Sequence, residues 1–274
     1  MAVTYLNNGA KSVADANWED GEGFGRTATD PQLIIQDATQ AITDNLDQSG
    51  ATNAVDYLWI IGGAPRIRAS DGSSLKIKPD ATYTTDPNFI WKTLAGNISI
   101  EFVTNACTLA IVDGGGEVTF TGGTITTLVV RSGKVIIGAG CTVVNLIVVG
   151  GDVTIVAGTA MTTFRLAGGR VDSDRLAVTC HIASGLFVLD NTTGTGMTLM
   201  NQLGGSFVPV AGDVATYNWQ RGSIERGSAE RKIDLGTTAF TNYSPSSIPG
   251  DTTFVTFSNK VDYAVTSSGP GGGV

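Results

Sequence analysis

A repeat of about eighteen residues in the middle of the chain is the feature that most restricts its fold. Four glycines are separated by 17, 18 and 18 residues, and each is followed at once by a charged residue whose sign alternates along the repeat. A fixed period of this kind predicts a β-solenoid in which each repeat forms one coil stacked on the next. The glycine and charge pairs are Gly116–Glu117, Gly133–Lys134, Gly151–Asp152 and Gly169–Arg170.

Apolar residues keep the same register as the glycines, which predicts the inward side of each coil. Three apolar sets are separated by glycine corners, so we expect a three-sided cross-section with strands about 4.8 Å apart along the rod. The expected inward sets are Val118, Val135 and Val153 with Phe120, Ile137 and Ile155; Ile125, Val143 and Met161; and Leu128, Leu146 and Phe164 with Val130, Val148 and Leu166, preceded by Leu109 and Ile111.

The sequence therefore predicts an all-β fold, a parallel β-helix (β-solenoid) with coils of about 18 residues. Asp30 and Pro31 are suited to begin a helix, and apolar residues at helical spacing predict a capping helix over residues 31–47. The repeat fades after residue 191. We expect three segments: an N-terminal arm and capping helix over 1–52, the solenoid over 53–191, and a C-terminal β-rich segment or arm over 192–274.

Composition excludes several function classes. The net charge of −8 and the pI near 4.6 argue against nucleic-acid partners and binding to anionic membranes. The start of the chain lacks the pattern of a secretory signal, and no apolar run is long enough to cross a bilayer. The three cysteines form no CxxC pair, so neither a disulfide framework nor a zinc site is predicted. We expect no metal and no cofactor.

Catalytic residues are also sparse. Cys107 and Cys180 continue the Ile125 series at spacings of 18 and 19, so both are expected in the core, and the single histidine, His181, follows Cys180 directly. The best enzymatic candidates are Asp172 and Asp174, which are two residues apart and could act on a polysaccharide as a carboxylate pair. Arg170 crowds that pair. We therefore predict a non-enzymatic protein and keep glycan chemistry as the alternative.

Two further groups of side chains are expected on the outside of the rod. The alternating charges Glu117, Lys134, Asp152 and Arg170 should stack as a ladder that fixes the register of the coils. Strand alternation also places an apolar strip outside, which is either covered by the C-terminal segment of the chain or used as a subunit interface. The residues of this strip are Val129, Ile147, Val149 and Ala167.

The layout resembles that of trimeric capsid decoration (cement) proteins of tailed bacteriophages. The resemblance rests on the Met-Ala-Val-Thr-Tyr-Leu start, the loop with Trp18, Gly21 and Gly23, the coils and the polar tail. It implies a structural homotrimer on the capsid surface of a virion, made in the host cytoplasm and bound to the major capsid protein or other virion subunits. The chain is also similar to bactofilin-like scaffolds and, less closely, to tailspike-like proteins. A docking arm is expected at Arg221, Arg226, Arg231 and Lys232.

Overall fold

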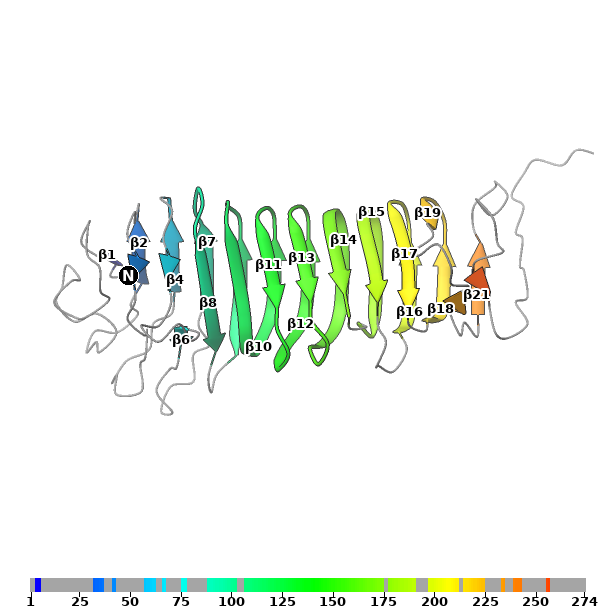
Figure 1. Cartoon of the computed structure of the whole chain (residues 1–274), viewed down its shortest axis with the longest axis horizontal. Helices are drawn as coiled ribbons and strands as arrows, with labels where there is room; N and C mark the ends of the chain where they lie inside the picture. The colour runs from blue at the N-terminus through cyan, green and yellow to red at the C-terminus, as the bar shows by residue number, and fades with distance from the viewer. Residues whose placement is uncertain are drawn as a thin grey trace, which may run out of the picture.

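The chain is an elongated rod of stacked β-coils in its computed structural model (Figure 1). Twenty strands form one sheet, every pairing between them is parallel, and none of the described residues is helical. The prediction of an all-β parallel β-solenoid is confirmed. The structure describes residues 3–5, 32–36, 41–42, 57–62, 66–67, 75–77, 88–102, 106–174, 177–190, 197–211, 214–224, 233–234, 239–242 and 255–256.

Most strands belong to two series, and each series forms one side of the rod. Within a series, each strand pairs in parallel with the strand of the next coil. Face 1 consists of β3 (Ala41–Ile42), β5 (Arg66–Ile67), β8 (Asn97–Phe102), the first part of β10 (Glu117–Val130), β11 (Lys134–Ile137), β13 (Asp152–Ile155), the ends of β14 (Ala160–Ser173) and β15 (Thr179–Asp190), β17 (Ser206–Ala211) and β19 (Ser223–Ile224).

Face 2 lies on the other side of the core. It consists of β1 (Val3–Tyr5), β2 (Gln32–Gln36), β4 (Tyr57–Ile61), β7 (Asn88–Lys92), β9 (Cys107–Val112), the last part of β10, β12 (Cys141–Val148), the first part of β14, the start of β15, β16 (Met197–Gln202), β18 (Val214–Trp219) and β21 (Ala239–Asn242). The strand β6 (Leu75–Ile77) pairs with β8, and β20 (Ile233–Asp234) pairs with β22 (Val255–Thr256) in a separate sheet.

A column of glycines with positive φ marks the corner that leads into face 1. At Gly151, φ is 79°, and a Cβ there would lie 2.5 Å from the carbonyl oxygen of Gly133 in the coil before. Only glycine combines this φ with so close an approach of backbone to backbone. The column continues beyond the four glycines of the sequence repeat and comprises Gly96, Gly116, Gly133, Gly151, Gly169, Gly185, Gly205 and Gly222.

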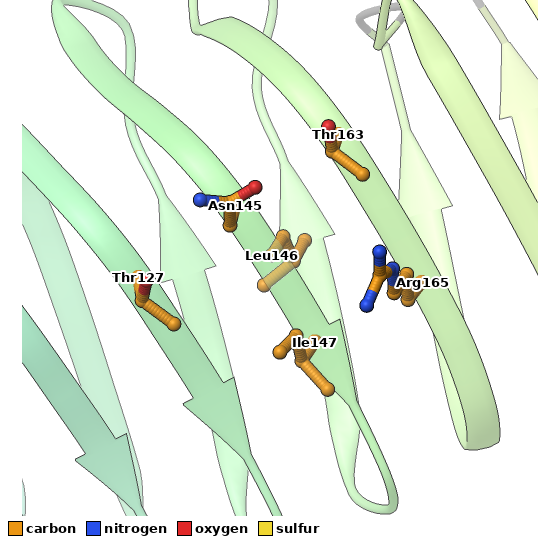
Figure 2. A pocket seen from close by; sticks show the side chains of 6 residues that line it. All are labelled: Thr127, Asn145, Leu146, Ile147, Thr163 and Arg165. Carbon is orange, nitrogen blue, oxygen red and sulfur yellow. The ribbon is translucent and has the colours of Figure 1, made fainter.

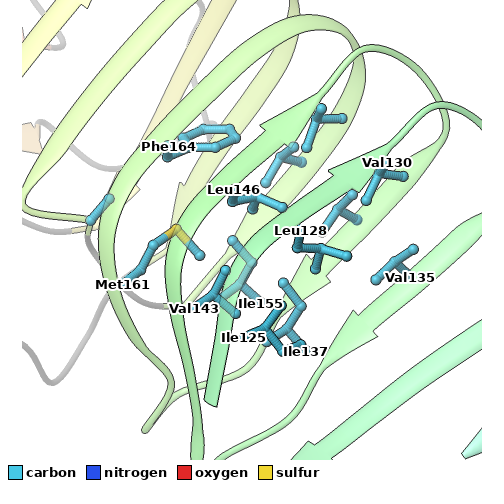
Figure 3. Close-up of a cluster of buried hydrophobic side chains, with 14 of the residues drawn as sticks. Ile125, Leu128, Val130, Val135, Ile137, Val143, Leu146, Ile155, Met161 and Phe164 are labelled. Atoms are coloured by element: carbon cyan, nitrogen blue, oxygen red, sulfur yellow. The ribbon is translucent and has the colours of Figure 1, made fainter. Parts of the chain in front are cut away.

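The core is continuous along the described part of the rod, from Leu58 to Trp219. The three inward sets of the regular coils are buried, and their side chains stack coil upon coil (Figure 3). Aromatic rings replace aliphatic side chains towards both ends of this region, where ring centroids lie 5.1–6.4 Å apart. These stacks are Phe89, Phe102 and Phe120, and then Phe164, Phe187, Phe207 and Tyr217.

The helix expected over residues 31–47 is wrong where the structure describes that segment. Residues 32–36 form strand β2 and residues 41–42 form strand β3. Leu33 and Ile35 align with Leu58 and Ile60 of β4, so this segment continues the parallel ladder of face 2. Tertiary pairing therefore overrides the helical spacing. The other residues of the segment lie outside the described residues.

The ladder of paired parallel strands extends beyond both ends of the segment 53–191, in which the sequence predicted the solenoid. Strands β1, β2 and β3 precede it and β16 to β19 and β21 follow it, all within the same sheet. Along the glycine column the spacing changes from 18 residues to 16 between Gly169 and Gly185, and to 20 between Gly185 and Gly205. Corner loops of variable length therefore hide the repeat in the sequence while the strands stay stacked.

Substitution in the glycine column is expected to destabilise the rod. Gly140 is the matched comparison, because its φ is also positive at 89° while its Cβ would meet no atom closer than 4.0 Å. An alanine at either position strains the backbone by about 1–3 kcal/mol, and at Gly151 it also collides with Gly133. We expect Gly151→Ala to lower the free energy of unfolding in urea more than Gly140→Ala does. Equal losses would mean that the close stacking is unimportant.

Candidate interaction surface

Face 2 carries an apolar outer column on the N-terminal side of the rod. Ile90, Ile111, Val129 and Ile147 occupy successive strands at the same register position. All four are partly exposed, whereas their neighbours along each strand are buried. This "apolar column" is therefore a continuous hydrophobic line on the outside of a sheet, and it extends the strip that the sequence predicted by two residues towards the N-terminus.

The sequence missed Ile90 and Ile111 because the alignment of one coil was wrong. Leu109 and Ile111 were expected to point inward, but they align with Thr127 and Val129 on the outer side of β10. The inward residues of β9 are Ala110 and Val112, eighteen residues before Leu128 and Val130. A search for the strict eighteen-residue spacing would have found them.

The other two residues of the expected strip lie elsewhere. Val149 and Ala167 are exposed at the corner between faces 2 and 1, and Val149 retains 51% of its accessible surface. The position that follows Ile147 in the column belongs to Arg165. The structure therefore brings Val129 and Ile147 together in one column and places Val149 and Ala167 beside it, past the end of face 2.

Beyond Ile147 the outer column becomes polar. Arg165, His181, Asn201 and Asn218 follow one another on β14, β15, β16 and β18. The side-chain amide of Asn218 donates to Asn201 Oδ1 over 2.8 Å, and Asn201 Nδ2 lies 3.3 Å from His181 Nδ1. Burial, and then the charge of Arg165, lower the pKa of His181 below its ordinary value of 6.5. A neutral ring with Nδ1 as acceptor fits this amide chain.

The charge ladder lies on face 1. Glu117, Lys134, Asp152 and Arg170 are at the same register position in β10, β11, β13 and β14. Lys134 Nζ is 2.7 Å from a carboxylate oxygen of Glu117. Arg170 turns instead towards Asp172, and this hydrogen bond, the charge of Asp172 and then that of Asp152 raise the pKa of the guanidinium. The pairs are partly exposed, so each contributes about 1 kcal/mol or less.

All three cysteines are buried, and none of them forms a disulfide. Cys107 aligns with Ile125, as the spacing predicts, but Cys180 aligns with Phe164 because a shorter corner precedes β15. Burial raises the pKa of Cys141 to about 11 and that of Cys180 higher still. Thiols protonated in this way are weak nucleophiles, so these side chains serve as core residues.

The aspartates considered for glycan chemistry lie at the end of β14. Arg170 Nε donates to both carboxylate oxygens of Asp172, at 3.1 and 3.0 Å. Burial, and then the charges of Asp190 and Asp172, raise the pKa of Asp174. The phenylalanines of these coils cannot serve as aromatic platforms for a sugar, because Phe102, Phe120, Phe164 and Phe187 are all buried in the core. The surroundings of the aspartates therefore offer little for recognition of a neutral glycan.

The expected docking arm is mostly outside the described residues. Arg221 is described and exposed, at the corner after β18, whereas Arg226, Arg231 and Lys232 are not among the described residues. The part of the chain that the structure describes contains no cluster of three or more metal-binding side chains. It also contains no helix with the length and hydropathy needed to cross a membrane.

Comparison with known proteins gives no relative. No family model, no curated protein and no solved structure matches the chain.

Reversing one charge of the ladder tests its role. Lys134→Glu places three negative side chains in succession, together with Glu117 and Asp152, so we expect a loss of about 1 kcal/mol in the free energy of unfolding. Lys134→Gln removes the attraction without adding repulsion and is the matched control. Because the residues are partly exposed, the difference between the two variants should shrink in high salt. If the difference in free energy of unfolding between the two variants did not depend on salt, the charge ladder would not act through electrostatic attraction.

The only histidine, His181, should make the stability of the protein depend on pH. The pKa of His181 is lower in the folded chain than in the unfolded chain, so the unfolded state takes up its proton first as the pH falls. The wild type should lose stability relative to His181→Gln as the pH falls below about 6.5, and the loss should level off below the folded-state pKa. Urea unfolding of both proteins at neutral and acidic pH measures this difference. If both proteins lost the same free energy of unfolding between neutral and acidic pH, folding would not change the pKa of the His181 ring.

Proposed function

We propose that this chain is a structural protein that self-associates through the apolar column of face 2. The observation that supports the proposal is the alignment of Ile90, Ile111, Val129 and Ile147 on the outer side of one sheet. A contiguous apolar line on the outside of an acidic protein normally marks a covered surface. Face 1 differs, since its half-buried Ile136 lies between Thr119 and Thr154.

The geometry of the rod favours a closed oligomer. The apolar column runs along the rod axis, because it joins equivalent positions of successive coils. Copies that meet along such a line can surround a common axis parallel to the rods, which gives cyclic symmetry and no open end. A trimer is the oligomer that we propose. The exposed Val149 would lie beside the contact and enlarge it.

The setting that we propose is a phage virion, in which the trimer decorates and stabilises the capsid. Support for this setting comes from the resemblance in layout to capsid decoration proteins and from the rigid, fully packed rod. Three linked copies would each contribute a weak contact to the major capsid protein, and the total would gain by avidity. Docking would involve the N-terminal region and the arm that begins at Arg221. No enzymatic activity is part of this proposal.

The mass of the purified protein tests self-association. We expect a stable oligomer in sedimentation analysis, and a trimer gives three times the mass of the 28.3 kDa chain. A monomer would refute the proposal. Filaments in negative-stain electron microscopy would favour the bactofilin-like alternative, in which rods join end to end.

A pair of matched variants tests which face makes the contact. Ile111 and Ile136 are both half-buried isoleucines on outer positions, the first on face 2 and the second on face 1. Ile111→Asp would bury a charge in the interface, at a cost of several kcal/mol, and should dissociate the oligomer. Ile136→Asp should leave the oligomer intact. The opposite result in size-exclusion chromatography with light scattering would move the interface to face 1.

A further inference from the structure

A small hollow lies on face 2 at the point where the outer column changes from apolar to polar. Its volume is about 260 Å³, and Figure 2 shows its lining side chains on β10, β12 and β14. The hollow is open to solvent and its lining spans three neighbouring strands, so a bound group could lie across the strands. Its lining consists of Thr127, Asn145, Leu146, Ile147, Thr163 and Arg165.

Arg165 supplies the only charge in this lining. The side chain is exposed, and no carboxylate of the described residues forms an ion pair with it. On both sides in its column it faces uncharged groups, Ile147 and the neutral ring of His181. The net charge of the whole chain is −8, but no acidic residue lies next to Arg165 in this column. The guanidinium is free to take a carboxylate in a bidentate arrangement.

The polar side chains beside Arg165 can form hydrogen bonds with the hydroxyl groups of a ligand. Asn145 Nδ2 donates to the backbone carbonyl of Thr126 over 3.3 Å, which orients the amide. Its Oδ1 is thereby turned towards β14 and Thr163, as Figure 2 shows, and can accept a hydrogen bond from a ligand. The hydroxyl of Thr163 can donate or accept. The side chain of Ile147 adds an apolar floor at the same place.

We propose that this hollow binds an acidic sugar residue, with the sugar carboxylate on Arg165 and its ring hydroxyls on Asn145 and Thr163. A uronic acid has a group for each part of the lining. It carries a carboxylate, ring hydroxyl groups and an apolar ring face that can pack on Ile147. Inorganic phosphate has neither the apolar face nor a comparable set of hydroxyls. Recognition through charge also needs no aromatic platform, and the phenylalanines of these coils are buried.

The polar part of the outer column lets a longer acidic glycan continue along the rod. His181 lies one coil beyond Arg165, and Asn201 follows it. With His181 Nδ1 facing the amide of Asn201, the other ring nitrogen carries the proton and can donate to a second sugar. The hollow lies at the polar end of the apolar column and shares Ile147 with it, whereas Ile90, Ile111 and Val129 lie outside its lining. The inference does not need the proposed self-association, and a contact between copies that stops short of Ile147 leaves the hollow open.

Titration calorimetry with a trisaccharide of galacturonic acid tests the proposal, with the neutral galactose trisaccharide as the matched ligand. We expect the acidic sugar to bind and the neutral one not to bind. Arg165→Gln should weaken binding about tenfold or more, since it removes a charge-assisted pair of hydrogen bonds. The control is Arg131→Gln, because Arg131 is also exposed but lies at the neighbouring corner, 3.6 Å from a carboxylate oxygen of Asp113. It should bind like the wild type.

Several results would overturn the proposal. These are no binding of the acidic sugar, equal binding of the neutral one, equal losses in the two arginine variants, or displacement by inorganic phosphate at the same concentration, which would indicate a simple anion site. The titration is repeated with Ile111→Asp, whose substitution lies two coils from Ile147. Retained binding supports a site within one chain. Binding lost only in that variant would place the site between subunits and overturn the single-chain hollow.

Discussion

The structure depends on one contact that is repeated at a single corner of every coil. At Gly96, Gly116, Gly133, Gly151 and Gly205 the carbonyl oxygen of the corner glycine accepts a hydrogen bond from the backbone N–H of the residue that follows the glycine of the next coil. Lys134 N donates to Gly116 O and Asp152 N donates to Gly133 O, both over 2.9 Å. A side chain at the glycine would separate the two coils at this point. The corner therefore fixes the stacking distance, and with it the alignment of every column on the core and on both faces.

This alignment explains why face 2 can carry two different surfaces in one line. Because equivalent residues of successive coils lie directly beside one another, a change of a single residue type changes the surface abruptly between neighbouring strands. The column passes from Ile147 to Arg165 in one step. The apolar part is suited to a second protein surface, and the polar part has hydrogen-bonding groups at regular intervals. The two parts meet at Ile147, so a second copy that covers Ile90, Ile111 and Val129 would leave the polar part open to a ligand.

The sequence predicted the central coils well and the ends of the ladder poorly. Between Gly116 and Gly169 the coils have nearly equal lengths, so the inward residues Val118, Val135 and Val153 could be read from spacing alone. Outside this region the corners gain or lose residues. One residue of error in the alignment reverses inside and outside, which is how Ile111 was assigned to the core and how the apolar column was only half found. The side chains of the hollow beside Arg165 could have been brought together from the repeat, since Thr127, Asn145 and Thr163 are 18 residues apart. The repeat gave no sign that they enclose a hollow.

By itself the sequence determined the solenoid and the alignment of the charged residues in one column, because both follow from a periodic spacing of glycine, valine and charged residues. Only the tertiary structure decided that residues 32–36 form a strand and that Cys180 aligns with Phe164. The physical reason is that a coil is held by hydrogen bonds to its neighbours in space. Those bonds tolerate insertions and deletions at the corners, whereas a spacing counted along the chain does not.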